Sequence, residues 1–246
     1  MTKLGNVPRR GYREVDVIPH AGGFGVRLDA RPLKTPAGNP MVVPTRALAE
    51  AIAAEWRAQG ARPNMERLPL TRVAATAIDC IPARRADVVA ELAAYAETEL
   101  VCHRASEPPA LVKRQTEIWQ PLLDWLTWRF DAALTVTTGV LPCAQSKRSL
   151  EALARAVGAL DDFRLAALSI AVAAAGSLVI GLALAEGRLD AGDAFDAAEL
   201  DASFQIEQWG EDELATRRRA GVRADLEVAA RFLALLGSEE GAQGSS

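Results

Sequence analysis

Histidine and cysteine are scarce in this sequence of 246 residues, which contains two of the first and three of the second. No two cysteines have a CxxC spacing, so the sequence predicts neither a zinc site nor a disulfide framework. Reduced thiols in a cytosolic chain are the simplest interpretation. Cys102 and His103 are neighbours, but adjacent side chains point in different directions and do not reliably form a nucleophile with its base. We expect His20 and His103 to be structural or surface residues.

The common catalytic and nucleotide-binding signatures are also missing. The sequence has no GxSxG, HExxH or GxGxxG pattern, and its GGFG run lacks the Gly-Lys-Ser/Thr that completes a phosphate-binding loop. Metal binding would depend on carboxylates alone, and the best candidates are Glu207, Glu211, Asp212 and Glu213. Without histidine beside them, an exposed acidic helix end is the favoured interpretation. No cofactor is expected, and a carboxylate–metal enzyme is the weakest alternative.

A secretory signal and an excess of basic charge are absent as well. The first residues, MTKLGNVPRRGYREV, have no apolar core, and they are too short and too poor in serine for a transit peptide. The formal net charge is −4, which does not indicate nucleic-acid binding. The charge is uneven, because residues 1–40 hold seven Lys/Arg against three acids, whereas residues 186–240 hold fourteen acids against six Arg. This asymmetry indicates a polarised surface.

The first third of the chain has strand and turn patterns. Residues 14–20 and 24–30 each alternate apolar and polar positions on either side of Gly22-Gly23, which predicts a β-hairpin. Residues 41–43 predict a short third strand after a loop rich in proline and glycine.

A first helix is expected over Arg46–Gln59, with Thr45 as its cap. Leu48, Ile52 and Trp56 share one face of this helix, and we expect Trp56 to anchor the core. Together with the hairpin, this helix predicts a small α+β domain over residues 1–68.

The remaining chain, residues 69–246, reads as a larger all-helical domain, with the boundary placed to within about ten residues. Pro121 is expected to kink or break its helix at Gln120. A seam of apolar residues predicts a last helix over 211–236, and its members are Val222, Leu226, Ala229, Leu233 and Leu236. Other helices are expected over residues 70–78, 87–99, 108–119, 122–130, 150–160 and 191–209.

An apolar run spans Leu165–Ala185, with no charge and nothing more polar than Ser169 and Ser177. A helix that is apolar on every side is buried, either inside a protein or in a bilayer. The 21 residues are long enough for a membrane span, but twelve of them are Ala, Gly or Ser, which favours a packed central helix. Asp161 can cap this helix and Gly187 can end it. A membrane-attached protein that uses Leu165–Ala185 as its span stays open as an alternative.

An acidic segment, Asp190–Glu213, has nine Asp/Glu and no Lys or Arg. One interpretation is a helix with a solvated acidic face and a core stripe, made by Phe195, Ala198, Ala202, Ile206 and Trp209. The other is a protein-docking surface, since aromatic side chains in charged surroundings are typical of interfaces.

Six specific stretches are distributed in order along nearly the whole chain, without a long insertion. They are GFGVRLDARPLKTPAGNPMVVPTRALAEAIAAEW (23–56), PLTRVAATAID (69–79), YAETELVCHRA (95–105), RQTEIWQPLLDW (114–125), GSLVIGLALAEGRL (176–189) and QIEQWGEDELATRRR (205–219). In these stretches the chain resembles the assembly chaperones of the F-type ATP synthase that handle its alpha subunit.

The resemblance implies a chaperone without enzymatic activity, which binds unassembled alpha subunit and prevents its aggregation until alpha pairs with beta. It also implies an α+β domain followed by a helical domain, and no membrane insertion. Eukaryotic members of the family work in the mitochondrial matrix. Because no transit peptide is predicted, the resemblance indicates a bacterial member in the cytoplasm.

Four residues of the family-like string QIEQWGEDE are predicted to bind the partner: Glu207, Trp209, Asp212 and Glu213. Packing alone explains them poorly, and a charged surface can shield a client without holding it too tightly. Trp209 is the weakest member, because the helical stripe places it in the core. Arg217–Arg219 can instead neutralise these acids within the chain.

Overall fold

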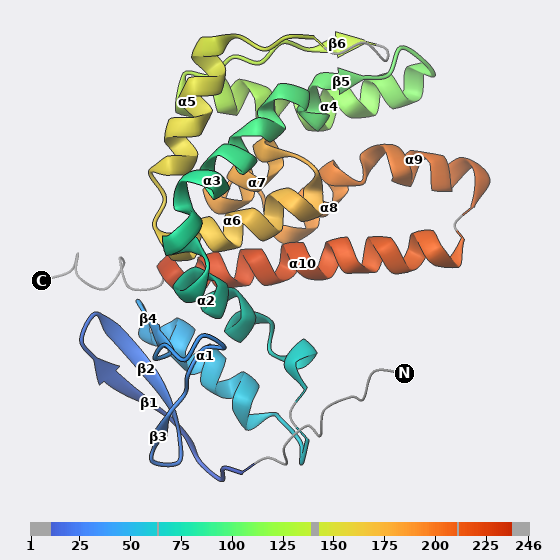
Figure 1. Cartoon of the computed structure of the whole chain (residues 1–246). Coiled ribbons are helices and arrows are strands. Elements are labelled where there is room, and N and C mark those ends of the chain that lie inside the picture. The colour runs from blue at the N-terminus through green and yellow to red at the C-terminus, as the bar shows by residue number, and fades with distance from the viewer. Residues whose placement is uncertain (1–10, 63, 139–142, 211, 238–246) are drawn as a thin grey trace, which may run out of the picture. The chain divides into compact units, whose positions relative to one another are not determined.

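The computed structural model describes residues 11–62, 64–138, 143–210 and 212–237. Of these, residues 11–83 and 231–237 form one compact unit, here called the N-terminal unit, and residues 84–230 form the helical unit. The fold class is α+β, as predicted, with a four-stranded sheet in the N-terminal unit and helices through most of the remaining chain (Figure 1). The domain boundary expected near residue 68 stays a prediction.

The sheet of the N-terminal unit confirms the predicted hairpin. The antiparallel pairing runs from Val15 opposite Leu28 to His20 opposite Gly23, and both short strands that follow also pair with the second strand. Gly23 has φ +148°, and a Cβ atom there would lie 2.2 Å from the Val43 carbonyl oxygen, so only glycine fits. The four strands are β1 (Val15–His20), β2 (Gly23–Leu28), β3 (Arg31–Pro32) and β4 (Val42–Val43).

Helix α1 (Arg46–Arg57) covers this sheet and begins where expected. The Thr45 hydroxyl accepts the Leu48 N–H at 3.2 Å, as in a standard N-cap. Leu48 and Ile52 are fully buried. Trp56 is only half-buried, and its indole N–H donates to the Thr71 hydroxyl at 3.2 Å.

Helix α2 (Pro69–Asp79) follows a short turn, η1 (Met65–Arg67), and lacks a cap of its own. Glu55 of α1 supplies one instead, because its carboxylate accepts the N–H groups of Leu70 at 2.7 Å and Thr71 at 2.9 Å. These are free donors of the first helical turn, which a carboxylate satisfies well. The carboxylate of Glu55 therefore links α1 to the start of α2 through these two hydrogen bonds.

The helical unit is built around two buried helices in the middle of the others (Figure 1). A break at Pro121 is not found, since helix α4 (Pro109–Phe130) continues through this residue, with Trp119 and Leu122 buried on either side of it; a kink there stays a prediction. The elements from residue 81 onward are α3 (Ile81–Ala94), η2 (Tyr95–Thr98), η3 (Leu100–Cys102), β5 (His103–Arg104), α4 (Pro109–Phe130), β6 (Thr137–Thr138), α5 (Lys147–Gly158), α6 (Asp162–Ala175), α7 (Leu178–Ala185), α8 (Ala191–Ala198), α9 (Leu200–Trp209) and α10 (Glu213–Gly237).

Most of the apolar run is buried, as predicted, but it is not one helix. Gly176 adopts a left-handed conformation with φ +66° and ends α6, and the Ser177 hydroxyl then accepts the Ile180 N–H at 3.0 Å to start α7. A Cβ atom at Gly181 would lie 2.5 Å from Val172 Cγ2, so this glycine allows α7 to lie close against α6. No helix among the described residues is long and apolar enough to cross a membrane.

A buried carboxylate fixes the break between α6 and α7. Glu99 is fully buried, and it accepts hydrogen bonds from the Ser177 hydroxyl and from the N–H groups of Leu178 at 3.0 Å and Val179 at 3.2 Å. Burial raises the pKa of Glu99 to about 7, although these hydrogen bonds and one from the Val101 N–H oppose the rise. The side chain of Glu99 thus holds the start of α7, which lies 78 to 80 positions later in the sequence.

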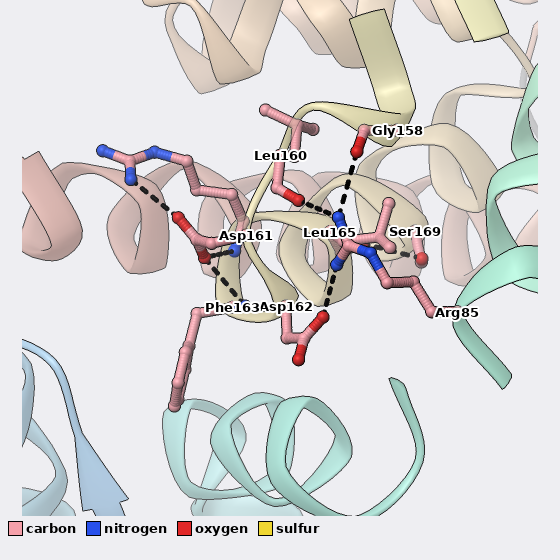
Figure 2. Close-up of polar contacts among 9 residues, drawn as sticks. Arg85, Gly158, Leu160, Asp161, Asp162, Phe163, Leu165 and Ser169 are labelled. Carbon is pink, nitrogen blue, oxygen red and sulfur yellow. Dashed lines mark hydrogen bonds and ion pairs between the residues drawn. The ribbon is translucent and has the colours of Figure 1, made fainter. Parts of the chain in front are cut away.

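The start of α6 is fixed by two arginines (Figure 2). Asp161 caps the helix as predicted, accepting the Phe163 N–H at 2.9 Å, and its other oxygen accepts the Arg164 guanidinium at 2.8 Å. Arg85 joins α3 to the connection between α5 and α6, where it donates to the Asp162 carboxylate and to the carbonyls of Gly158 and Leu160.

The predicted seam of α10 is confirmed in part. Leu226, Ala229 and Leu236 are buried, whereas Val222 and Leu233 are half-buried. Phe232, which the predicted spacing omits, is also fully buried. The end of the chain, over residues 237–246, is predicted from its sequence to be frayed, but residues 238–246 lie outside the described residues.

Candidate functional site

The acidic segment folds as two helices rather than as the single helix predicted over 191–209. The chain leaves helical geometry at Glu199, between α8 and α9. This side chain is 6% exposed and receives the Arg218 guanidinium through two hydrogen bonds, at 2.9 Å and 2.6 Å, with Arg219 at 3.3 Å. A carboxylate held by two cations ties the break to α10. Of the acids that Arg217–Arg219 were predicted to neutralise, only Glu213 pairs with this group among the described residues, through Arg217, whereas Arg218 and Arg219 pair with Glu199 instead.

Glu207, in the last turns of α9, is paired with Arg114 of α4. Both guanidinium Nη atoms donate to the two carboxylate oxygens, at 2.7 Å and 2.9 Å, and the same guanidinium lies 5.4 Å from the centre of the Phe204 ring. These hydrogen bonds from Arg114 hold the pKa of the Glu207 carboxyl below its ordinary value. Glu207 is therefore a partly exposed, charge-compensated link between two helices.

Trp209 is 77% exposed, so the prediction that the helical stripe places it in the core is wrong. The stripe assumed one continuous helix, and the break at Glu199 changes the phase of the residues that follow. Phe195 and Phe204 are buried, at 4% and 6% exposure, and account for the aromatic part of the core face. Trp209 is left as an indole in solvent at the end of α9.

The other two predicted residues begin α10. Asp212 caps this helix, since its carboxylate accepts the Ala215 N–H at 2.8 Å. Glu213 forms an exposed ion pair with Arg217, four residues later. Leu214, the second residue of α10, is 80% exposed. No pattern in the sequence predicted its exposure.

The four predicted residues therefore lie on either side of the connection from α9 to α10, here called the α9–α10 turn. The structure gives Glu207, Asp212 and Glu213 partners within the chain, and it leaves Trp209 and Leu214 as large apolar side chains in solvent. Exposed apolar groups rimmed by charged residues are typical of protein–protein contact surfaces.

Chemistry at cysteine or at a metal finds little support in the described residues. No group of three His, Cys, Asp or Glu side chains is placed to hold a metal ion in the part of the chain that the structure describes, and Glu211 lies outside that part. Burial, with the nearby negative charge of Glu99, raises the pKa of the Cys102 thiol to about 12, so this cysteine is not a thiolate at neutral pH.

Large apolar side chains exposed among charged residues are typical of proteins that bind other proteins. Comparison with known proteins gives the family. A family model described as ATP12 chaperone protein matches residues 9–127. The crystal structure of Atp12 from Paracoccus denitrificans is similar with a TM-score of 0.90 and 41% identity, over 93% of this chain and 98% of that chain. The chain belongs to the ATP12 chaperone family.

Two further relatives agree with this assignment. An aspartate-to-lysine variant of the Paracoccus protein is similar with a TM-score of 0.90 and 40% identity, over 93% of this chain and 98% of that chain. The protein named atp12, mitochondrial, from Schizosaccharomyces pombe is 24% identical over 214 residues, which is 82% of this chain and 74% of the relative.

Proposed function

We propose that this chain is an assembly chaperone of the F-type ATP synthase, which binds unassembled alpha subunit and keeps it from aggregating until it pairs with beta. Membership in the ATP12 chaperone family supports the chaperone role. The resemblance of the six sequence stretches supports the choice of client. A cytoplasmic location in a bacterium and the lack of enzymatic activity are parts of the same proposal.

The observation that carries the proposed contact site is the exposure of Trp209 beside acids that already have partners. An unassembled ring subunit exposes apolar interface, which aggregates unless it is covered. A tryptophan offers a large, rigid contact area at low entropic cost. Because Glu207 and Glu213 are paired within the chain, a client can cover them without burying an unpaired carboxylate.

Displacement by beta requires that this contact is not too strong. One aromatic anchor on a charged, solvated turn buries less surface than a permanent subunit interface. Compensated charges direct the encounter more than they add affinity. The α9–α10 turn therefore has the properties of a contact that is made quickly and is released when a larger interface forms.

The test is co-expression of alpha subunit with this chain, scored by the amount of soluble alpha that co-purifies. Trp209→Ala should lower the affinity for alpha by at least about tenfold, the size expected of an interface anchor. Trp128→Ala is the matched control, since Trp128 is 83% exposed in the same unit and lies on α4. It should leave binding unchanged.

The acidic residues are tested by charge reversal. Reversal of Glu207, Asp212 and Glu213 together should weaken alpha binding, whereas Glu151→Lys should not, because Glu151 also forms an exposed ion pair four residues from its partner but lies on α5. Wild-type binding that survives both Trp209→Ala and the triple reversal would remove this turn from the client surface. An alpha subunit indifferent to the wild-type chain would refute the proposed function itself.

A further inference from the structure

A second surface with binding properties lies in the N-terminal unit. It is an open pocket of about 440 Å³, a size found among ligand sites. We call it the Met65 pocket, after the side chain that is 49% exposed at it. Its walls come from the loop before β4, from the end of α1 and from one face of α2, and are made by Lys34, Thr35, Pro36, Met41, Trp56, Met65, Thr71, Arg72, Ala75, Thr76, Asp79 and Cys80.

The polar groups of this pocket are mostly committed within the chain. The Thr71 hydroxyl accepts the Trp56 N–H at 3.2 Å and donates to Glu55 at 2.7 Å. The Thr76 hydroxyl donates to the Arg72 carbonyl at 3.1 Å. What these walls offer to a ligand is therefore mainly the apolar surface of methionine, proline, alanine and the half-buried indole.

Asp79 is committed in the same way. Its carboxylate accepts the Thr35 hydroxyl at 2.7 Å, the Asn39 side-chain amide at 2.9 Å and the Ala37 N–H at 3.1 Å. These hydrogen bonds hold the loop over residues 35–39 against the end of α2. Three of its acceptor positions are therefore already occupied within the chain.

The lining of the Met65 pocket has a net positive charge, because Lys34 and Arg72 outnumber Asp79, whose hydrogen-bond partners are neutral. Lys34 and Arg72 both line it and are exposed, and neither has an ion pair within the described residues. Two uncompensated cations beside an apolar surface complement a ligand that combines apolar groups with carboxylates. Methionine side chains adapt to different apolar shapes, so the pocket suits a variable sequence rather than one fixed ligand.

We propose that the Met65 pocket binds an acidic, apolar segment of a protein client, with one or two apolar side chains inserted among Met41, Trp56 and Met65 and a neighbouring carboxylate facing Lys34 and Arg72. A peptide is favoured over a small polar metabolite, because the free polar groups that the lining offers are mainly two exposed cations at an otherwise largely apolar surface, rather than a convergent set of donors and acceptors that would orient such a ligand. That the client is the alpha subunit rests on the proposed function. The pocket gives the N-terminal unit a contact of its own with the client, of opposite charge preference to the acidic α9–α10 turn.

The direct test uses two fluorescent peptides with the same Leu-Phe-Leu centre, one flanked by glutamates and the other by lysines, and measures their anisotropy with the full chain. The wild-type chain should bind the glutamate-flanked peptide and bind the lysine-flanked one at least about tenfold more weakly. Thr76→Trp should fill the pocket from an exposed position on α2 and weaken binding to a similar extent. Met65→Glu should do so by repelling the glutamate flanks.

Matched controls separate the pocket from general effects. Val136→Glu places the same charge at an apolar residue that is 40% exposed in the helical unit, and it should not change peptide binding. The double reversal Lys34→Glu, Arg72→Glu should reverse the preference between the two peptides. Arg62→Glu reverses an exposed cation of the same unit that does not line the pocket, and it should leave that preference intact. Thermal unfolding checks that each variant is folded.

Equal binding of the two peptides by the wild-type chain, or undiminished binding by both Thr76→Trp and Met65→Glu, would overturn the inference. Co-expression with alpha subunit then distinguishes this outcome from a failure of the proposed function. If wild-type and Thr76→Trp chains keep alpha soluble equally well, the pocket is not a client site and the proposed function stands. If alpha ignores the wild-type chain while the peptide results hold, the pocket binds acidic apolar segments and the choice of client is wrong.

Discussion

Replacement of Glu99 by alanine should destabilise the helical unit more than any surface change. The substitution leaves the Ser177 hydroxyl and the N–H groups of Leu178 and Val179 buried without their acceptor. A buried polar group without a partner costs about 1–3 kcal/mol. Allowing for partial relaxation, we expect a loss of about 3–5 kcal/mol in the free energy of unfolding, out of the roughly 5–15 kcal/mol of a typical domain.

The same carboxyl group should make stability depend on pH. Burial raises the pKa of Glu99 from its ordinary 4.5 to about 7 in the folded chain, so the folded state holds this proton more strongly than the unfolded state. The resulting stabilisation is complete below pH 4.5, decreases as the pH rises from 4.5 to 7, and is lost above 7. The span between the two pKa values corresponds to about 3 kcal/mol.

Guanidinium unfolding, followed by tryptophan fluorescence, measures both effects, because four of the five tryptophans lie in the helical unit. Glu99→Gln cannot titrate, so the difference in unfolding free energy between it and the wild type should change by about 3 kcal/mol across this pH window. Glu151→Ala, on the exposed face of α5, is the control and should change little. A loss below about 1 kcal/mol for Glu99→Ala, or a pH-independent difference for Glu99→Gln, would refute the reasoning.

Three further outcomes are expected. Gly181→Ala should lower the unfolding free energy by about 1–3 kcal/mol, because its Cβ atom would lie 2.5 Å from Val172 Cγ2; a neutral effect in chemical unfolding would mean that α6 and α7 separate easily. Arg114→Ala should return the pKa of Glu207 toward its ordinary value, which NMR titration of the carboxyl carbon measures; an unchanged pKa would contradict the ion pair. Trp209→Ala should change the free energy of unfolding by no more than about 0.5 kcal/mol, because the indole ring is mostly in solvent. A larger decrease in chemical unfolding would show that the ring packs against other side chains.

Local patterns predicted the parts of the fold that depend on neighbouring residues. The hairpin follows from alternation around Gly22-Gly23, and the start of α1 follows from a threonine hydroxyl that reaches the N–H three residues later. The burial of Leu165–Ala185 follows from composition alone. In each case the interaction that decides the structure lies within one turn or one strand pair.

The parts that sequence reasoning missed depend on partners far along the chain. The apolar run is divided because Glu99 supplies acceptors for the first N–H groups of α7, and no pattern within the run shows this. The acidic segment is divided at Glu199, which Arg218 and Arg219 hold from α10. That second break changes the helical phase of the residues that follow, including Trp209, so the local spacing of apolar residues could not predict the exposure of this side chain.

The candidate sites show the same limit. All four predicted contact residues lie at the α9–α10 turn, but the sequence could not show that three of them have partners within the chain. The Met65 pocket was not predicted at all. Its lining combines a loop, the end of one helix and a face of another, and no spacing along the chain joins these segments.

The internal pairing of Glu199, Glu207 and Glu213 has a consequence for how ionic strength affects this protein. Each of these three carboxylates faces a guanidinium at 3.3 Å or less, so three of the nine acids in the segment are compensated within the chain and its field is weaker than the number of acids suggests. Salt screens charges that are separated in solvent far more than it affects charges already in contact. Association through the α9–α10 turn should therefore persist at salt concentrations that abolish binding at Lys34 and Arg72, and a client held at both places would be released from the N-terminal unit first.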